Sequence, residues 1–210
     1  MKKTLFALLT LGSLTATVPA DDVAVLQFKT GPQTQRVVLE FYEESAPLTV
    51  ANFKKLAGSG FYTVTAIHRV FPHLMVQAGD PLSKQKGNPG IGTGGPGYTL
   101  APEIGRKQIA GAVAAARLPD KINPARRSNG SQFFITVQPM PNLDGEYTVF
   151  AHVVEGLDVL DKISQETADT NDSPVSRILL TSVRIVPREQ VQPSGAPGKN
   201  WLQRNFQCVF

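Results

Sequence analysis

The stretch from Ala66 to Asp80 carries the side chains that are best suited to chemistry. Its residue types predict two short strands joined by a turn at Phe71-Pro72-His73. Side chains alternate faces along a strand, so Met75 and Gln77 share a face. If the two strands pair across the turn, Arg69 joins them there. One face then presents a guanidinium, an amide and a soft apolar side chain, which indicates a binding or catalytic site rather than an ordinary strand surface.

The histidines of this stretch do not form a hydrolytic or metal-binding constellation. His68 and His73 lie five residues apart across the turn, with no acidic or cysteine partner at ligand spacing. The chain also has no H-E-x-x-H motif and no G-x-S-x-G nucleophile elbow. Since His68 directly precedes Arg69 on a strand, it should face the opposite side. We therefore expect a hydrogen-bonded core histidine rather than a general base, and no metal site.

A glycine-rich segment from Gly90 to Gly95 satisfies the spacing G-x-G-x-x-G. A dinucleotide site needs this pattern between a parallel strand and a helix, because the helix N-terminus meets the phosphates. Here Pro96-Gly97 follows, without a helical pattern. The segment is therefore predicted to be a loop, and no nucleotide cofactor is expected.

Two strands and a helix are predicted ahead of the candidate site. Val23–Phe28 and Arg36–Tyr42 are apolar-rich runs separated by the turn-forming cluster Thr30-Gly31-Pro32, which indicates an antiparallel hairpin. A helix then begins at Pro47, a residue suited to the first turn, and ends at Gly58-Ser59-Gly60. Apolar residues recur at helical spacing between these points, so the helix should bury one face.

Four more strands and one short helix are predicted after the glycine-rich loop. The helix is indicated by apolar residues at helical spacing from Leu157 to Ile163. The strands occupy the apolar runs Gln108–Ala116, Gln132–Gln138, Tyr147–Val154 and Arg177–Val186. Strands outnumber helices, and the connections are too short for repeated β-α-β units. We therefore predict a mostly β domain with an antiparallel, closed or nearly closed sheet.

The first twenty residues have the organisation of a secretory signal peptide. Lys2 and Lys3 form a positive n-region, Leu5–Leu14 forms an apolar h-region, and Val18-Pro19-Ala20 is a small-residue cleavage site. The apolar run is too short to cross a bilayer permanently. We expect a signal peptide at 1–20, cleavage after Ala20, and a periplasmic or secreted protein without a stable membrane anchor. A buried N-terminal helix is the alternative.

The rest of the chain is predicted to divide into one domain, residues 21–187, and a flexible tail, residues 188–210. The tail shifts in composition to Gln, Pro, Gly, Ser and Asn. Its apolar residues from Trp201 to Phe210 leave docking on the body or on a partner as an alternative. Cys208 is the only cysteine, so no internal disulfide can form.

The charge of the chain does not favour binding to nucleic acid. Removing residues 1–20 takes away Lys2 and Lys3, so the 21 basic side chains fall to 19 against 17 acidic ones. The basic residues are scattered, and the densest pair is Arg126-Arg127. A nucleic-acid partner is therefore not expected.

Several sequence blocks between Val23 and Pro187 combine the features described above. They are His68-Arg69-Val70-Phe71-Pro72, Met75-Val76-Gln77-Ala78-Gly79-Asp80, Gly92-Thr93-Gly94-Gly95, Asn129-Gly130-Ser131-Gln132-Phe133-Phe134-Ile135, and Leu143-Asp144-Gly145 with Val149-Phe150. In this order and spacing the blocks resemble the cyclophilins, a family of peptidyl-prolyl cis-trans isomerases. The resemblance implies a closed eight-stranded antiparallel barrel capped by two helices. It also implies a monomeric enzyme that acts on proline-containing polypeptides without a cofactor, a metal or a covalent intermediate.

The resemblance assigns roles to individual residues. Arg69 matches the catalytic arginine, and Gln77 matches the glutamine that hydrogen-bonds the arginine and the substrate. The positions that match the apolar pocket for the proline ring are Leu74, Met75, Phe134 and Leu143. The remaining contacts that the resemblance implies are the main chain of Ala116, Arg117 and Leu118, the flanking Gln132, and Tyr147 at the rim.

The chain departs from the best-known eukaryotic members at four positions: Leu74 for a phenylalanine, Asn142 for a tryptophan, Arg117 for an asparagine and Tyr147 for a histidine. Bacterial members look similar at Arg117 and Tyr147, which favours a bacterial exported type. Without the tryptophan, inhibition by cyclosporin should be weak. The presence of both Arg69 and Gln77 favours an isomerase that assists the folding of exported proteins. The alternative is a proline-segment binding module or chaperone without catalysis.

Overall fold

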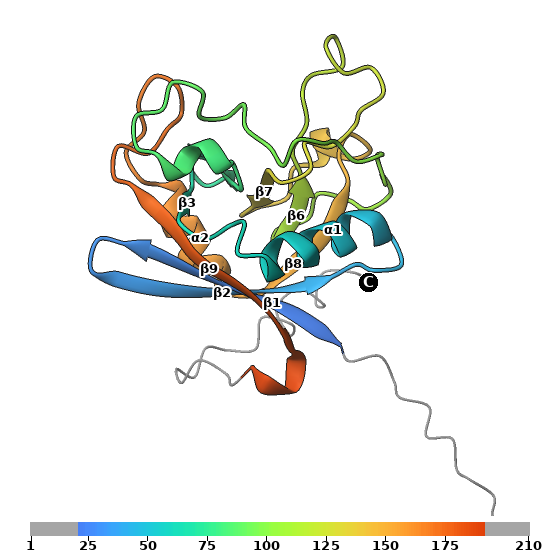
Figure 1. Cartoon of the computed structure of the whole chain (residues 1–210), viewed down its shortest axis with the longest axis horizontal. Helices are drawn as coiled ribbons and strands as arrows, with labels where there is room; N and C mark the ends of the chain where they lie inside the picture. Colours follow the sequence, from blue (N-terminus) through green and yellow to red (C-terminus); the bar gives the residue numbers. More distant parts are fainter. Residues whose placement is uncertain (1–20, 192–210) are drawn as a thin grey trace, which may run out of the picture.

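The computed structural model describes residues 21–191, and these residues form one β-sheet with two α-helices (Figure 1). The predicted signal peptide at residues 1–20 and the end of the predicted tail, with Trp201 and Cys208, lie outside the described residues. Within residues 21–191, no helix is both long enough and apolar enough to span a membrane.

The sheet has nine strands in the order β3-β9-β1-β2-β8-β6-β7-β5-β4. Each pair of neighbours is antiparallel. The strands are β1 (Asp22–Thr30), β2 (Gln33–Phe41), β3 (Thr65–Ala66), β4 (Arg69–Phe71), β5 (Met75–Ala78), β6 (Ala112–Ala115), β7 (Phe133–Thr136), β8 (Val149–Glu155) and β9 (Ile178–Pro187). The predicted first hairpin is confirmed by the pairing of β1 with β2, and Figure 1 shows β9 running along the other side of β1.

The sheet differs from the predicted closed eight-stranded barrel in both strand number and closure. β3 and β4 stand at opposite ends of the sheet order, yet only Ile67 and His68 separate them in the chain. The Ile67 amide donates to the Ile178 carbonyl on β9, whereas the His68 amide donates to the Gln77 carbonyl on β5, each at 3.0 Å. The chain therefore changes its hydrogen-bonding partner between these two residues. This change splits one strand into two. Within residues 21–191 no hydrogen-bond ladder joins β3 to β4, so the sheet is curled rather than closed.

Two α-helices pack on separate parts of the sheet. α1 (Pro47–Gly58) contacts β8 and β9, and it begins at Pro47 and ends before Ser59, as predicted. α2 (Leu157–Ser164) contacts β2, β4 and β5. Single 3-10 turns occur at η1 (Pro81–Lys84), η2 (Pro141–Leu143) and η3 (Arg188–Gln190).

The main hydrophobic core lies between the inner face of the sheet and the two helices. Phe53 of α1 packs its ring against Phe133 on β7 and Phe150 on β8, with centroid separations of 5.6 and 5.3 Å. Leu160 and Ile163 of α2 are buried in the same cluster. Each such side chain stabilises the fold by roughly 1.5–3 kcal/mol relative to an exposed position. The core therefore fixes the strands from which the candidate site projects.

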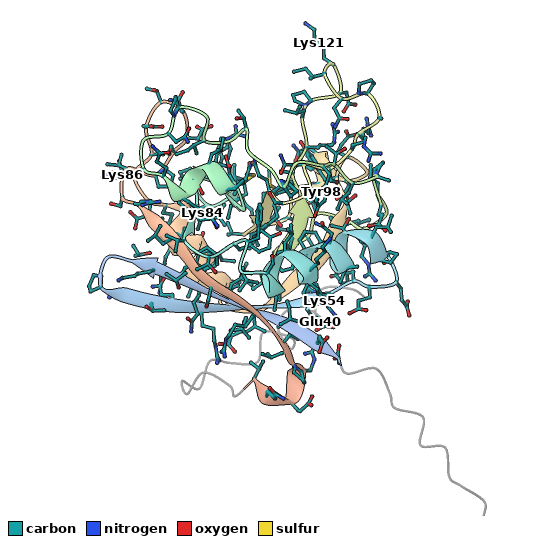
Figure 2. All side chains as sticks on the ribbon, viewed as in Figure 1. Glu40, Lys54, Lys84, Lys86, Tyr98 and Lys121 are labelled. Carbon is teal, nitrogen blue, oxygen red and sulfur yellow. The ribbon has the colours of Figure 1, made fainter. Side chains whose placement is uncertain are left out.

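The described start of the predicted tail contacts the domain. Arg188 in η3 donates from Nε to Asp21 at 2.7 Å and places Nη2 2.5 Å from a carboxylate oxygen of Glu40. Elsewhere, charged side chains are spread over the surface, and the labelled Lys54, Lys84 and Lys121 occupy separate regions in Figure 2. This distribution agrees with the scattered basic residues in the sequence.

Candidate functional site

A row of directly opposed residues crosses four strands of the sheet. Arg69 on β4 lies opposite Gln77 on β5, Gln77 lies opposite Phe134 on β7, and Phe134 lies opposite Ala114 on β6. Directly opposed residues in antiparallel strands project to the same face. The predicted pairing of Arg69 with Gln77 across the turn is thus confirmed, and the row brings Phe134 to the same face.

The residues that alternate with this row along the same strands point to the opposite face, which packs in the main core. Val70, Val76 and Phe133 are 1%, 2% and 2% exposed and belong to the main cluster. In contrast, the Arg69 side chain is 44% exposed. Because the period of a strand is two, burying one set of residues fixes the orientation of the other set.

A second hydrophobic cluster covers the face that carries the row; we call it the apolar cluster. Its buried members are Met75, Ala112, Ala114, Ala116, Phe134 and Val149. Its partly buried members are Tyr42, Phe71, Leu74, Met140, Leu143 and Tyr147. The structure therefore brings together six of the predicted substrate contacts: Leu74, Met75, Ala116, Phe134, Leu143 and Tyr147. Phe134 and Tyr147 meet edge to face, with ring centroids 5.1 Å apart.

The Arg69 guanidinium stands beside this cluster, between a ring and a carboxylate. Its central carbon lies 4.5 Å from the centroid of the Phe71 ring. Nε and Nη2 lie 3.3 and 3.2 Å from Oδ2 of Asp172, in the segment between α2 and β9. Sequence reasoning missed Asp172, because 103 residues separate it from Arg69 and no motif marks it.

Gln77 is held from the side opposite to Arg69. Its Nε2 donates to Oε1 of Gln132 at 2.9 Å, and Nε2 of Gln132 donates to the carbonyls of Gly92 and Gly94 at 3.0 and 2.8 Å. The hydrogen bond from Gln77 to Arg69 that the resemblance implies is not among those of residues 21–191. Gln132 is 4% exposed, so the side chain that orients Gln77 is buried.

The glycine-rich segment is a loop, as predicted, and it wraps around a buried carboxylate. Asp80 is fully buried, and its Oδ2 accepts from the amides of Gly92 and Gly94 while Oδ1 accepts from Leu82. A Cβ at Gly94 would lie 2.1 Å from Oδ1 of Asp80. The glycines therefore allow close approach to Asp80, and their carbonyls then receive Gln132.

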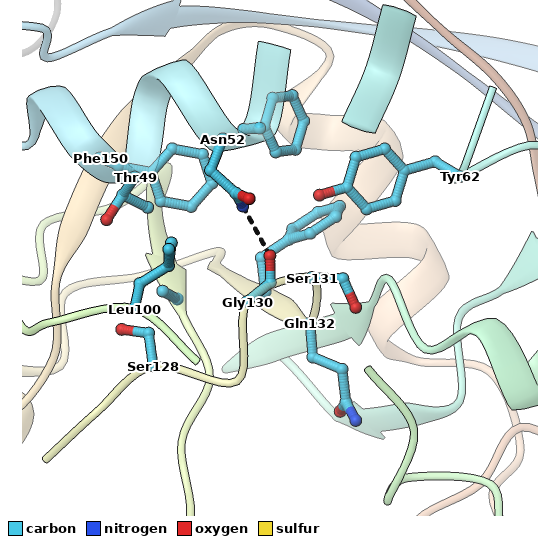
Figure 3. A pocket seen from close by; sticks show the side chains of 12 residues that line it. Thr49, Asn52, Tyr62, Leu100, Ser128, Gly130, Ser131, Gln132 and Phe150 are labelled. Atoms are coloured by element: carbon cyan, nitrogen blue, oxygen red, sulfur yellow. Dashed lines mark hydrogen bonds between the residues drawn. The ribbon is translucent and has the colours of Figure 1, made fainter. Parts of the chain in front are cut away.

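Gln132 is further positioned by the contact of its chain segment with α1. Asn52 of α1 donates from Nδ2 to the Gly130 carbonyl at 2.6 Å. This contact borders a cavity of about 10 Å³ beneath α1, roughly the space of one water molecule. In Figure 3 the side chain of Gln132 points away from Asn52 and Tyr62, and its Oε1 accepts from Nε2 of Gln77.

A hollow of about 270 Å³ adjoins the row; we call it the polar hollow. Its lining residues are Gln77, Gly92, Thr99, Ala116, Arg117, Leu118, Ile122, Asn123, Arg127, Asn129 and Gln132. It therefore contains the remaining predicted contacts, Arg117, Leu118 and Gln132. The Ala116 amide already donates to the Gln132 carbonyl at 2.9 Å. A substrate main chain would therefore have to bind the main chain of the residues next to Ala116.

Arg117 is a structural anchor as well as a lining residue. Its side chain is 6% exposed, lies 4.9 Å from the Tyr147 ring centroid and donates from Nε to the Glu146 carbonyl at 2.9 Å. It also pairs with the carboxylates of Asp120 and Glu146. These contacts join the wall of the polar hollow to the apolar cluster.

His68 is buried, as predicted. Neither ring nitrogen makes a hydrogen bond of ordinary geometry among residues 21–191, but the Ala66 main chain and the Gln132 side chain lie close enough to the ring to raise its pKa. Burial lowers the pKa of His68 below its ordinary value, more strongly than the nearby Asp80 carboxylate raises it. The imidazole is therefore neutral at neutral pH and faces away from Arg69. Within the same residues, no group of three or more His, Cys, Asp or Glu side chains is arranged to hold a metal ion.

Residues 25–185 match the family model described as cyclophilin type peptidyl-prolyl cis-trans isomerase/CLD. Peptidyl-prolyl cis-trans isomerase-like 1 of Neurospora crassa is 34% identical over 156 residues, which are 73% of this chain and 90% of that protein. Peptidyl-prolyl cis-trans isomerase B of Bacillus subtilis is 41% identical over 132 residues, which are 61% of this chain and 83% of that protein.

A solved structure is also similar to this chain. A cyclophilin type peptidyl-prolyl cis-trans isomerase of Cryptosporidium parvum superposes with a TM-score of 0.68 at 26% identity, covering 79% of this chain and 97% of the other. A second structure of that protein, in the presence of the dipeptide Ala-Pro, gives a TM-score of 0.66. The similar proteins thus include fungal, bacterial and apicomplexan members.

Proposed function

The chain belongs to the cyclophilin family of peptidyl-prolyl cis-trans isomerases, and we propose that Arg69 and Gln77 catalyse its reaction on X-Pro bonds of exported proteins. Unaided rotation about an X-Pro bond takes tens to hundreds of seconds, because amide resonance must be lost in the twisted state. An enzyme accelerates this rotation by stabilising the twisted amide, which requires no cofactor.

Arg69 is suited to that stabilisation. In the twisted state the proline nitrogen becomes pyramidal and gains a free lone pair, and a fixed guanidinium can donate a hydrogen bond to it without transferring a proton. Arginine is always charged and presents its donors in a rigid planar fork, which lysine cannot reproduce. A preorganised donor of this kind contributes roughly 3–4 kcal/mol to transition-state stabilisation.

The neighbouring surfaces would hold the substrate. The apolar cluster, with Met75 and Phe134 beside Arg69, offers the proline ring an apolar contact surface. Gln77, whose Nε2 donates to Gln132, would hydrogen-bond the substrate main chain. The polar hollow lies alongside and would receive residues that flank the X-Pro bond. The observation that carries the proposal is the row that aligns Arg69, Gln77 and Phe134 on one face.

The test is a protease-free isomerisation assay on a short X-Pro peptide at low temperature, where the uncatalysed reaction is slow. Arg69→Ala should lose at least about a hundredfold in kcat/KM, because the donor to the proline nitrogen is gone. Arg184→Ala, an exposed arginine on β9, is the matched control and should keep its activity. Near-normal turnover by Arg69→Ala would contradict the role of Arg69. Slow turnover by the unmodified protein, with intact peptide binding, would favour a proline-segment binding module.

Export is supported by the order of the positive, apolar and small-residue regions in residues 1–20. Folding clients outside the cytoplasm, in the periplasm or beyond the cell, would then be the substrates, as in a bacterial exported type. Expression of the full chain in a Gram-negative host should yield a periplasmic product that lacks residues 1–20, as measured by fractionation and intact mass. A product that retains these residues in the cytoplasm would contradict export.

A further inference from the structure

We propose that Asp172 is a positioning residue for the reaction, which holds the Arg69 guanidinium in the orientation required by the substrate. The inference rests on the role proposed for Arg69. Nε and Nη2 of Arg69 both approach one oxygen of Asp172, Oδ2, at 3.3 and 3.2 Å. Because the guanidinium is a rigid planar fork, fixing this edge also fixes the direction of the other donors.

A second contact restricts the rotation that remains. The guanidinium carbon of Arg69 lies 4.5 Å from the centroid of the Phe71 ring, which itself packs against the apolar cluster. The carboxylate therefore holds one edge of the guanidinium while the ring covers one of its faces. The Nη1 edge makes neither of these contacts. The Arg69 side chain is 44% exposed, so that edge can reach a bound peptide.

The turn that carries Asp172 is held by several hydrogen bonds. Asp169 accepts from the amides of Asn171 and Ser173 through its Oδ1, at 2.8 and 3.0 Å. The Asp172 amide donates to the Asp169 carbonyl at 3.1 Å. The Asp172 carbonyl in turn accepts from the Val70 amide at 2.9 Å, directly beside Arg69 in β4. The carboxylate is therefore tied to the same strand as the guanidinium that it contacts.

The backbone conformation at Asp172 does not require an aspartate. Its φ is +60°, in the left-handed region that glycine adopts with the least strain. Aspartate tolerates this region better than most residues, but glycine adopts it with less strain. The Asp172 and Arg69 side chains are 40% and 44% exposed, and exposed ion pairs contribute little to stability. Orientation of Arg69 is the role that remains.

Two substitutions separate orientation from folding. Asp172→Gly removes the carboxylate and relieves the left-handed backbone, so the fold should be retained. We expect kcat to fall about tenfold with KM nearly unchanged, because a misoriented donor costs rate rather than binding. Asp172→Asn keeps an oxygen acceptor and tolerates the left-handed region, so it should recover most of kcat. Asp158→Asn, which removes an exposed charge on α2, should leave kcat unchanged.

The Nε–H resonance of Arg69 in ¹H–¹⁵N NMR spectra gives an independent readout. In the unmodified protein the Nε–H should exchange slowly with solvent, and in Asp172→Gly it should broaden or disappear. In the Arg69→Ala background, Asp172→Gly should cause no further loss of kcat, because the residue that it positions is absent.

Three outcomes would overturn the role of Asp172 alone. They are an unchanged kcat in Asp172→Gly, an effect on KM only, or a full further loss in the Arg69→Ala background. Each of them can occur while Arg69→Ala by itself still loses about a hundredfold in kcat/KM. Near-normal turnover by Arg69→Ala would instead overturn the proposed role of Arg69, and the role of Asp172 with it.

Discussion

The two polar residues of the row, Arg69 and Gln77, mark two ends of a polar segment, and these ends are held by opposite kinds of structure. At one end, Arg69 is exposed and is held by the exposed carboxylate of Asp172 and by the Phe71 ring. At the other end, Gln77 is bonded to the buried Gln132. Gln132 is bonded to glycine carbonyls whose own amides surround the buried Asp80.

This difference separates stability from activity. A buried carboxylate that accepts several amides is costly to remove, because those amides are left unpaired away from water. An exposed ion pair is cheap to break, because water replaces each partner. Substitutions at the Asp80 end should therefore act mainly on stability, whereas substitutions at the Arg69 end should act mainly on turnover.

Asp80→Ala should have the largest effect on stability. It removes the acceptor for the amides of Leu82, Gly92 and Gly94. We expect the free energy of unfolding to fall by about 3–5 kcal/mol, as measured by urea denaturation. The exposed control Asp158→Ala should change it by no more than about 0.5 kcal/mol. Equal effects of the two substitutions would contradict the larger contribution of the buried carboxylate to stability.

Gly94→Ala should have the next largest effect. A Cβ there would lie 2.1 Å from Oδ1 of Asp80 and 2.9 Å from Cγ of Leu82, so the loop must move. We expect a loss of about 2 kcal/mol in stability and a fall in activity, because Gln132 loses the Gly94 carbonyl. Gly58→Ala, where a new Cβ meets nothing within 4 Å, is the matched control. It should be neutral or stabilising by up to about 1 kcal/mol.

Stability should also depend on pH, in a direction set by the buried His68 and the partly buried His152. Burial lowers the pKa of His68 and of His152 below the ordinary value near 6.5, and outweighs the nearby carboxylates Asp80 and Glu40. The unfolded chain therefore binds protons at a pH where the folded chain does not. Their contribution is fully present above about pH 6.5 and is lost as the pH falls below it. Urea denaturation between pH 5 and pH 8 should show this fall, and His68→Gln should make it shallower. A flat profile in the unmodified protein would contradict this assignment.

Arg69→Ala should have the smallest effect on stability, although it should abolish most of the activity. The pair with Asp172 is exposed on both sides, so we expect a change of no more than about 0.5 kcal/mol in the free energy of unfolding. Thermal and urea denaturation of the variant used in the isomerisation assay measure this directly. A loss of several kcal/mol would mean that the exposed end also supports the fold.

The sequence predicted most of the elements that surround the site, because their signals are local. Pro47 and Gly58-Ser59-Gly60 mark the ends of α1 where the structure has them. The alternation of Arg69, Met75 and Gln77 with buried neighbours predicted which face would carry the site. The sheet was predicted less well, since closure depends on how Ile67 and His68 divide their hydrogen bonds between β9 and β5.

The partners of the candidate residues could not be predicted in this way. The resemblance implied that Gln77 holds Arg69, whereas the structure bonds Gln77 to Gln132 and Arg69 to Asp172. It also could not indicate that the glycine-rich loop encloses Asp80. Each of these contacts depends on a side-chain direction that only packing determines.

The sequence by itself therefore determined the main elements and the residues that share the face of the candidate site, and its resemblance to the cyclophilins indicated the family. The elements and the shared face depend on residue type and on periodicity along the chain, which are local properties of the sequence. Tertiary structure alone decided the nine-stranded open sheet and the hydrogen-bond partners of Arg69, Gln77 and Asp80. Asp172 reaches Arg69 across 103 residues of chain, and only the curling of the sheet and the turn before β9 bring the two groups into contact.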